Sequence, residues 1–333
     1  MKKLPAISDY FLKHAGNFGA EVTLDDTYGY AGKIVFPNGN TRYFKYNHID
    51  INTVGSSEIA KDKSYAAFFM SGMGYKTIEG QVFFSNEWAV DIGSTQTAKE
   101  AVQYASKIGF PVFVKPNDSG TGFGVSIAYN TEEMNDAIEN ALLYSKVFLV
   151  QKPYLGRNDY RLVVFNGEFI CAYKKEPLFV MGDGTKTMQE LFDEKKKTFD
   201  ALGRSFSITL DDYRIKNFFK REGMSGQTIL DTGVKCVLLP NANLSQGGEG
   251  VDVTDEVTDS WKIWAIELAK KMNLKFCGID VLVSGDVSGD SNDSVIIEVN
   301  ASPGLNHYKT LGKKAMDRTD DLYKKILDYL AHS

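Results

Sequence analysis

Two spacings of apolar residues alternate along this chain of 333 residues. Short aliphatic and β-branched runs bounded by turn residues predict strands, and apolar residues that recur every three or four positions predict helices. The stretch 97–152 shows both: helix, strand, loop, strand, helix, strand. Thr97 precedes its first helix, Gly109 follows that helix, and Thr131 is expected to cap the second. A glycine-rich loop at 116–124 separates two of the strands.

Two antiparallel hairpins are predicted in the second half of the chain. One spans 162–173 and turns at Asn166-Gly167, a strong short turn signal. The other joins 278–283 to 295–300 through a polar run of turn-forming residues. A C-terminal amphipathic helix is expected, with its apolar side at Leu322, Ile326, Leu327 and Leu330. The stretch 193–230 is charged and gives no clear pattern.

The first part of the chain, 1–57, shows little helical pattern. Its clearest feature is a hairpin within 32–46 that turns at Asn38-Gly39. A helix is then expected from a serine cap at 56 or 57 to the glycine at 72. Residues 1–57 are therefore interpreted as a small β-rich segment whose role the sequence leaves open.

Composition indicates an ordinary folded protein, with 43% hydrophobic and 24% charged residues. The net charge is −5 and no basic run occurs, so a nucleic-acid partner is not expected. Cys171, Cys236 and Cys277 are odd in number and far apart, which argues against a disulfide framework and fits a reducing compartment. No signal peptide and no run of about 20 apolar residues is found, so we expect a cytoplasmic protein without a membrane partner.

Acidic and amide side chains interrupt the predicted hairpin near the end of the chain. Glu298 and Asn300 are two apart on one strand and point to the same face, which Asp280 on the neighbouring strand can join. Such oxygen ligands suit Mg²⁺. The alternative is a solvated hairpin with a few acids at its edge, and the hairpin alone leaves both interpretations open.

A lysine and three glycines form the second candidate. Lys115 ends a strand and faces a loop with Gly120, Gly122 and Gly124, where backbone N–H groups can wrap phosphates. The loop lacks the Walker A and Rossmann spacings, and a flexible surface loop is the alternative. The strand end Gln151-Lys152 could pair with an adenine edge or be an ordinary linker.

The motifs occur in an order that resembles the ATP-grasp superfamily. They lie at 114–116 with the glycine loop, 156–161, 242–248, 251–257, 278–280 and 297–304. The resemblance covers roughly 58–312 and is greatest to the ATP-grasp domains of cyanophycin synthetase and of bifunctional glutathione synthetases, here expected in a stand-alone form. It implies an α+β fold in which two subdomains clasp ATP. The expected parts are 1–57, 58–152 with the loop, and 153–333 with the metal site.

The resemblance also implies roles for individual residues. The expected ATP-binding residues are Lys63, Lys115, Ser119, Gly120, Thr121, Gly122, Gly124, Gln151, Lys152 and Asp159. The expected metal ligands are Asp280, Glu298 and Asn300, for two Mg²⁺ ions with Mn²⁺ as the alternative metal. Relatives usually carry arginine where this chain has Leu239. The cations expected to act in its place are Arg161 first and then Arg214 or Lys216, and Lys115 is also expected to take part in catalysis.

The reaction implied by the resemblance joins a carboxylate to an amine. ATP phosphorylates the carboxylate, the amine attacks the acylphosphate, and ADP and phosphate are released. Amino acids or short peptides are the expected substrates, and a homo-oligomer is possible. Two alternatives remain open. One is a ligase that modifies a ribosomal precursor peptide, with 1–57 or 193–230 as its docking element. The other is a nucleotide-binding regulator without turnover.

Overall fold

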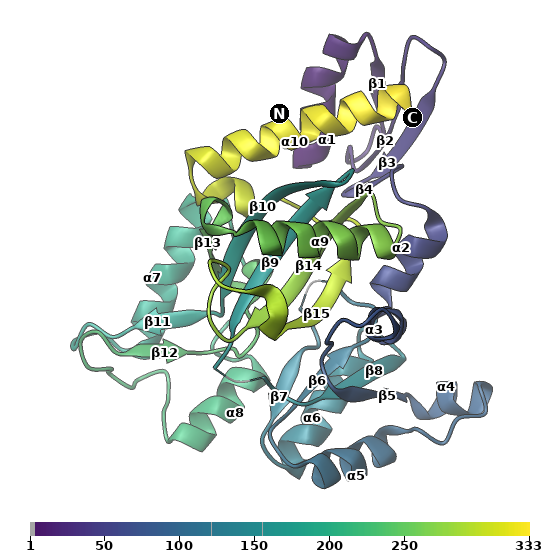
Figure 1. The fold of residues 1–333 in the computed structure, drawn as a ribbon. Helices are drawn as coiled ribbons and strands as arrows, with labels where there is room; N and C mark the ends of the chain where they lie inside the picture. The colour runs from purple at the N-terminus through teal and green to yellow at the C-terminus, as the bar shows by residue number, and fades with distance from the viewer. Residues whose placement is uncertain (1–3, 121, 155) are drawn as a thin grey trace.

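The computed structural model describes residues 4–120, 122–154 and 156–333. Figure 1 shows the chain from its N-terminus in purple to its C-terminus in yellow, with both termini at the same end of the molecule. The N-terminal elements are α1 (Ala6–His14), η1 (Ala15–Phe18), β1 (Glu21–Leu24), β2 (Ala31–Val35), β3 (Thr41–Lys45) and β4 (His48–Ile49). The four strands form an antiparallel sheet in chain order. The predicted hairpin at Asn38-Gly39 is confirmed as β2 and β3.

One helix in this N-terminal part was not expected from the pattern. The helix α1 buries Ile7, Tyr10 and Phe11, which lie at helical spacing, and it spans only nine residues. A helix of this length is too short to give a clear periodic signal, and tertiary packing stabilises it.

The expected helix from position 56 to 72 is two helices, α2 (Val54–Lys61) and α3 (Lys63–Gly72). The break is at Asp62, which is extended, with φ −83° and ψ 105°. Its carboxylate accepts a hydrogen bond from the N–H of Tyr65 at 2.9 Å and so caps the second helix. The first helix begins at Val54, so the predicted serine cap was wrong.

The next part is a sheet with helices on one face. Its elements are β5 (Gly80–Phe84), α4 (Asn86–Asp91), α5 (Ala98–Ile108), β6 (Val112–Pro116), β7 (Ser126–Ala128), α6 (Thr131–Leu142) and β8 (Val147–Gln151). The strand order is β5-β8-β6-β7, all antiparallel, and α5 and α6 pack against it around Met134 and Phe148. The predicted order for 97–152 is confirmed, except that Asn130 rather than Thr131 caps α6.

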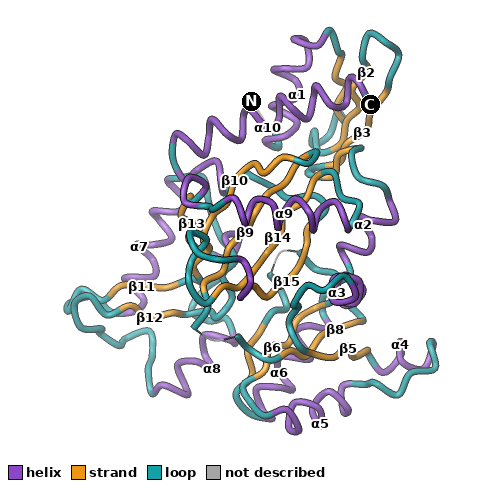
Figure 2. The backbone as a smooth tube through the Cα atoms, in the orientation of Figure 1, coloured by secondary structure: helices purple, strands orange, loops and turns teal. Residues whose placement is uncertain are grey.

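The central sheet has the order β13-β10-β9-β14-β15. Its strands are β9 (Asn158–Phe165), β10 (Glu168–Glu176), β13 (Glu249–Asp252), β14 (Phe276–Val283) and β15 (Ser294–Asn300). Both predicted hairpins are confirmed as β9–β10 and β14–β15. In Figure 2 this sheet and β5-β8-β6-β7, both orange, lie one above the other, with α3 beside them.

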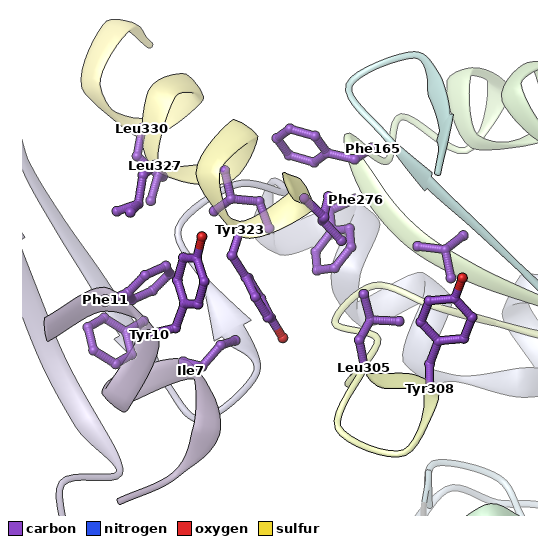
Figure 3. Close-up of a cluster of buried hydrophobic side chains, with 14 of the residues drawn as sticks. Ile7, Tyr10, Phe11, Phe165, Phe276, Leu305, Tyr308, Tyr323, Leu327 and Leu330 are labelled. Carbon is purple, nitrogen blue, oxygen red and sulfur yellow. The ribbon is translucent and has the colours of Figure 1, made fainter. Parts of the chain in front are cut away.

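Helices cover both faces of the central sheet. Leu162 and Val164 pack with α9 (Asp259–Lys271), whereas the alternate residues Val163 and Phe165 pack on the opposite side. That opposite core joins the sheet to α10 (Lys313–His332) and α1. Figure 3 shows the side chains of α1, including Phe11, next to those of α10. The N-terminal segment therefore shares a hydrophobic core with the C-terminal helix.

The region 177–240, which includes the stretch 193–230 that gave no clear pattern, has a core of its own. It contains β11 (Phe179–Met181), α7 (Met188–Ala201), α8 (Tyr213–Glu222) and β12 (Lys235–Val237). The remaining short 3₁₀ turns are η2 (Leu244–Gln246), η3 (Thr254–Glu256), η4 (Ser291–Asp293) and η5 (Tyr308–Leu311). In the described residues no helix has the length and apolar character to cross a bilayer.

Candidate active site

Two adjoining cavities lie over the central sheet. The first, of about 730 Å³, has apolar walls from both larger sheets, including Phe113, Ile127, Leu282 and Ile297. The second, of about 500 Å³, reaches the N-terminal segment and the chain after β15. Both are lined by Lys63, Ser119, Gly120, Lys175, Asp280 and Glu298. The charged residues therefore lie where the two cavities meet.

Strand register explains why these charges gather. Asp280 on β14 is opposite Arg161 on β9 and opposite Glu298 on β15. On the other side of β9, Lys175 on β10 is opposite Asp159. Residues opposite or two apart on neighbouring strands share a face. A row of charged side chains therefore crosses four adjacent strands.

The row is tightly paired. Arg161 donates from Nε and from one terminal nitrogen to the two carboxylate oxygens of Asp280, each at 2.5 Å. The Nζ of Lys175 lies 2.9 Å from Asp159 and 3.1 Å from Asp280. Bidentate arginine pairs are among the stronger charge-assisted contacts. Arg161 and Asp280 are therefore fixed relative to each other before any ligand binds.

Lys63 connects the row to the glycine loop. It is the first residue of α3, and its Nζ lies 3.2 Å from Glu298 and donates to the backbone oxygen of Ser119 at 2.7 Å. The start of α3 is also held by Asn117, whose carbonyl accepts the N–H of Lys63 at 3.1 Å. Because the helix breaks at Asp62, the buried side chain of Lys63 reaches the glycine loop.

Burial and neighbouring charges shift several pKa values. Burial, and then repulsion from Lys63, lowers the pKa of Lys115 to about 8. Burial raises the pKa of Asp159 to about 7, although the Lys175 ammonium opposes this. Burial alone would raise the pKa of Glu298, but Lys63 and Lys115 hold it well below its usual range.

The row and the two lysines beside it, Lys63 on α3 and Lys115 on β6, together have an excess of one positive charge. The four cations are Lys63, Lys115, Lys175 and Arg161, and the three carboxylates are Asp159, Asp280 and Glu298. Perturbed groups in a cavity are typical of functional sites, although structural ion pairs perturb pKa values as well. The excess favours a polyanionic ligand at the junction of the cavities.

Residues of the glycine loop line both cavities. Ser119 and Gly120 line both, and Gly122 lines the first. Gly122 has φ +73°, and a Cβ there would lie 2.3 Å from the amide nitrogen of Asn243, which belongs to the motif at 242–248. Gly124 also has positive φ, and a Cβ there would meet Pro116. Thr121 lies outside the described residues.

The candidate adenine hinge lies at the end of β8. Gln151 is buried and pairs with Gly80 across the strands, and both Gln151 and Lys152 line the first cavity. The backbone N–H of Lys152 donates to the carbonyl of Glu79 at 3.0 Å, and its ammonium pairs with the Glu79 carboxylate. The candidate hinge, Gln151-Lys152, is therefore joined by backbone hydrogen bonds to β5 and forms part of the wall of the first cavity.

The position of the missing arginine and the cations considered as its substitutes separate in the structure. Leu239 is buried in the core of the 177–240 region. Arg214 pairs with Asp212 and donates to the carbonyl of Val125 at 2.9 Å, and it lines neither of the two adjoining cavities. Lys216 is exposed, pairs with Asp211 and lines neither cavity. Among Arg161, Arg214 and Lys216, only Arg161 belongs to the charged row.

One member of the row was missed from the sequence. Counting back from the Asn166-Gly167 turn pairs Asp159 with Lys174. A register shift between Phe169 and Cys171 instead places Lys175 opposite Asp159. No turn signal in the sequence marks this bulge.

Comparisons with known proteins agree with the motifs and the fold. Residues 70–176 match the family model "D-ala D-ala ligase C-terminus", and 241–329 match "RimK-like ATP-grasp domain". The chain belongs to the ATP-grasp superfamily. The structure superposes on a bifunctional glutathione synthetase from Pasteurella multocida with a TM-score of 0.61 and 22% identity, covering 98% of this chain and 44% of that one. This ATP-grasp fold confirms the predicted α+β class.

Sequence relatives point to the same group. The glutathione biosynthesis bifunctional protein of Clostridium perfringens is 30% identical over 224 residues, covering 63% of this chain and 28% of its own. Cyanophycin synthetase of Trichormus variabilis is 30% identical over 258 residues, covering 74% of this chain and 27% of its own. The chain thus spans about a quarter of the length of these curated relatives.

ATP-grasp ligases in general use ATP and Mg²⁺, and the donor set here fits that ion. Asp280 and Glu298 supply two carboxylates at the junction of the cavities, and Asn300 lines the second cavity. The amide nitrogen of Asn300 donates to Glu298 at 3.0 Å, which leaves the amide oxygen available as a metal ligand. No cluster of three histidine, cysteine or acidic side chains suited to a metal occurs in the described part of the chain. Two carboxylates completed by amide and phosphate oxygens suit Mg²⁺.

Proposed function

We propose that this protein is an ATP-dependent carboxylate–amine ligase that releases ADP and phosphate and forms an amide bond between amino acids or short peptides. The observation that supports this most directly is the charged row at the junction of two cavities. A nucleotide in the first cavity and a carboxylate in the second would meet at these cations. Phosphoryl transfer needs such positioning and charge stabilisation.

The apolar walls of the first cavity suit a base, and Gln151 and Lys152 at the hinge suit its polar edge. Lys63, Lys115 and the glycine loop then suit the phosphates. We propose that Lys115 and Arg161 act on the reacting groups. Asp159 is expected to hold Lys175 in place, because the two are paired at 2.9 Å.

Asp280, Glu298 and Asn300 are the residues that would hold Mg²⁺, with two ions expected and Mn²⁺ a possible substitute. The bound ion would offset charge on the phosphate groups. The row's own cations contribute to the same task, and the glycine loop would exclude water that hydrolyses an acylphosphate. Attack of the amine on the acyl carbon then releases phosphate.

The test is a screen of ADP and phosphate release over pairs of amino acids and dipeptides with Mg²⁺-ATP, with mass spectrometry of the products. We expect ADP release that depends on both substrates and a product that is one water lighter than their sum. ATP binding without stimulated release would favour a nucleotide-binding regulator. Product formation only on a long precursor peptide would favour a peptide-modifying ligase.

A further inference from the structure

The N-terminal segment forms a packed wall of the second cavity. Asn47, between β3 and β4, and His48, the first residue of β4, line it together with the chain after Asn300. The imidazole Nδ1 of His48 lies 2.9 Å from the hydroxyl of Ser302, and a Cβ at Gly304 would lie 2.4 Å from the amide nitrogen of Asn47. These close contacts fix the N-terminal segment against the site.

Asn52 fixes the same wall from behind. Its amide nitrogen donates to the carbonyls of Phe276 and Ala301, both at 2.7 Å. Its oxygen accepts the N–H groups of Lys275 at 2.7 Å and Phe276 at 3.0 Å. With its donors and its acceptor all used, Asn52 ties the entry to α2 to the ends of β14 and β15.

The helix α2 presents two opposite charges to this cavity. Glu58 and Lys61 line it, both are exposed, and they are three positions apart on the helix. Other pairs at this spacing form ion pairs, such as Lys262 with Asp259 at 2.9 Å and Lys324 with Asp321 at 3.3 Å. For Glu58 and Lys61 no ion pair occurs within the described residues. Their charges are available to a ligand.

The other end of the cavity carries charges of both signs. Lys63, Arg161 and Lys175 line it at the junction with the first cavity, together with Asp280 and Glu298, and Asp118 of the glycine loop is the remaining carboxylate of the lining. The cavity therefore has a carboxylate and an ammonium on α2, and at the junction three cations beside the two carboxylates that would hold the metal. Its volume of about 500 Å³ is suitable for a small molecule. The complementary ligand carries an ammonium and a carboxylate at one end and a second carboxylate at the other.

We propose, building on the proposed ligase function, that the second cavity takes an acidic amino acid that is activated at its side-chain carboxylate. Glu58 binds its α-ammonium and Lys61 its α-carboxylate. A side-chain carboxylate oxygen attacks the γ-phosphorus of ATP, and the bond to the β-phosphate oxygen breaks to release ADP. The amine then forms a bond to the acyl carbon, and the C–O bond breaks to release phosphate, which takes up the amine proton.

The experiment uses hydroxylamine as the amine, so that the natural amine substrate need not be known. The full chain with Mg²⁺-ATP is assayed for hydroxamate and ADP with L-aspartate and L-glutamate, and with their N-acetyl and α-methyl ester derivatives. These derivatives keep the reacting carboxylate and each lack one charge of the amino-acid head. We expect each to raise KM at least about tenfold for the unmodified protein, which corresponds to a charged contact of about 1.4 kcal/mol or more.

The variants make the assignment specific. We call the rise in KM that each derivative causes the N-acetyl penalty and the ester penalty. Glu58→Gln should remove the N-acetyl penalty and Lys61→Met the ester penalty, while KM for ATP stays the same. Asp118→Asn is the comparison variant, because Asp118 is another exposed carboxylate of the same cavity, and it should keep both penalties. Glu139→Gln, on the exposed side of α6, controls for charge removal elsewhere.

The outcomes separate the two proposals. If no carboxylate gives hydroxamate or ADP, the ligase function fails, and this inference with it. If monocarboxylic amino acids react as well as acidic ones, or if Glu58→Gln and Lys61→Met keep both penalties, the ligase function stands and the acidic amino-acid site is wrong. Loss of discrimination in Asp118→Asn instead would also overturn the assignment to Glu58.

Discussion

Glu298 is the residue on which most of the site converges. It lies opposite Asp280, 3.2 Å from Lys63, and accepts a hydrogen bond from Asn300. We expect Glu298→Gln to lower turnover by at least about 10²-fold, since loss of a charged metal ligand costs several kcal/mol of charge stabilisation. The fold should be unchanged by circular dichroism, and activity should require more Mg²⁺. Near-normal turnover in a folded variant, with Glu139→Gln as the matched control, would refute the metal assignment.

Arg161 distinguishes a catalytic from a structural cation. Its bidentate pair with Asp280 fits both roles. We expect Arg161→Met to lower kcat by roughly 10²-fold, the typical effect of losing one oxyanion donor, with little change in ATP affinity. Arg161→Lys should recover only part of the lost kcat, because lysine keeps the charge but not the two parallel N–H donors of the guanidinium. If kcat holds and only Tm falls, Arg161 is structural. Arg318→Met on α10 is the control for loss of a partly buried arginine.

Lys115 gives the ATP site a pH dependence of known sign. Its pKa is lowered to about 8, so the ammonium that attracts phosphate is present below pH 8 and is lost as the pH rises above it. We expect the ATP dissociation constant to rise between pH 8 and 9.5, with a slope that approaches about tenfold per pH unit. Titration calorimetry measures this. Lys115→Met should bind ATP weakly with a flat profile, and an equally steep profile in that variant would assign the titration to another group.

At the scale of elements, the sequence predicted both hairpins, the order of 97–152 and the common sheet face of Asp280, Glu298 and Asn300, whose metal-binding role stays a prediction. These predictions succeeded because strand periodicity and Asn-Gly turns are local signals. Three features were not predicted from the sequence. The bulge that brings Lys175 to Asp159 has no local signal. The break at Asp62 is set by a cap within an otherwise helical pattern, and α1 depends on contacts with α10 far along the chain.

The glycine loop is the element expected to move with nucleotide. A Cβ at Gly120 would meet nothing within 4 Å, whereas one at Gly122 would lie 2.3 Å from the amide nitrogen of Asn243. We expect limited proteolysis to cut at 119–124 without nucleotide, and Mg²⁺-ATP to protect the loop. Gly122→Ala should weaken that protection, because alanine disfavours its positive φ and its Cβ opposes close approach to Asn243. Equal cleavage with and without nucleotide would contradict a covering role.

At the scale of the whole molecule, the N-terminal segment and the C-terminal helix form one core beneath the site. Phe11 is fully buried, with its ring 5.0 Å from Phe44 and 6.5 Å from Tyr323 between ring centres. The same segment continues to Asn47 and His48 at the wall of the second cavity. Packing far from the charged row is therefore expected to influence the binding of the second substrate more than that of ATP.

The last prediction tests this connection. Phe11→Ala should lower the free energy of unfolding by about 3–5 kcal/mol, the usual cost of deleting a buried phenylalanine. In the fraction that remains folded, KM for the carboxylate substrate should rise while the ATP dissociation constant stays nearly constant, because the first cavity is lined by other parts of the chain.

Leu12→Ala is the matched control, since Leu12 is the next residue of α1 and is 45% exposed. Denaturant unfolding and initial-rate kinetics measure the two effects. Equal stability losses in both variants would contradict the shared core. A parallel loss of ATP affinity in Phe11→Ala would show that the N-terminal segment supports the whole site and not the second cavity alone.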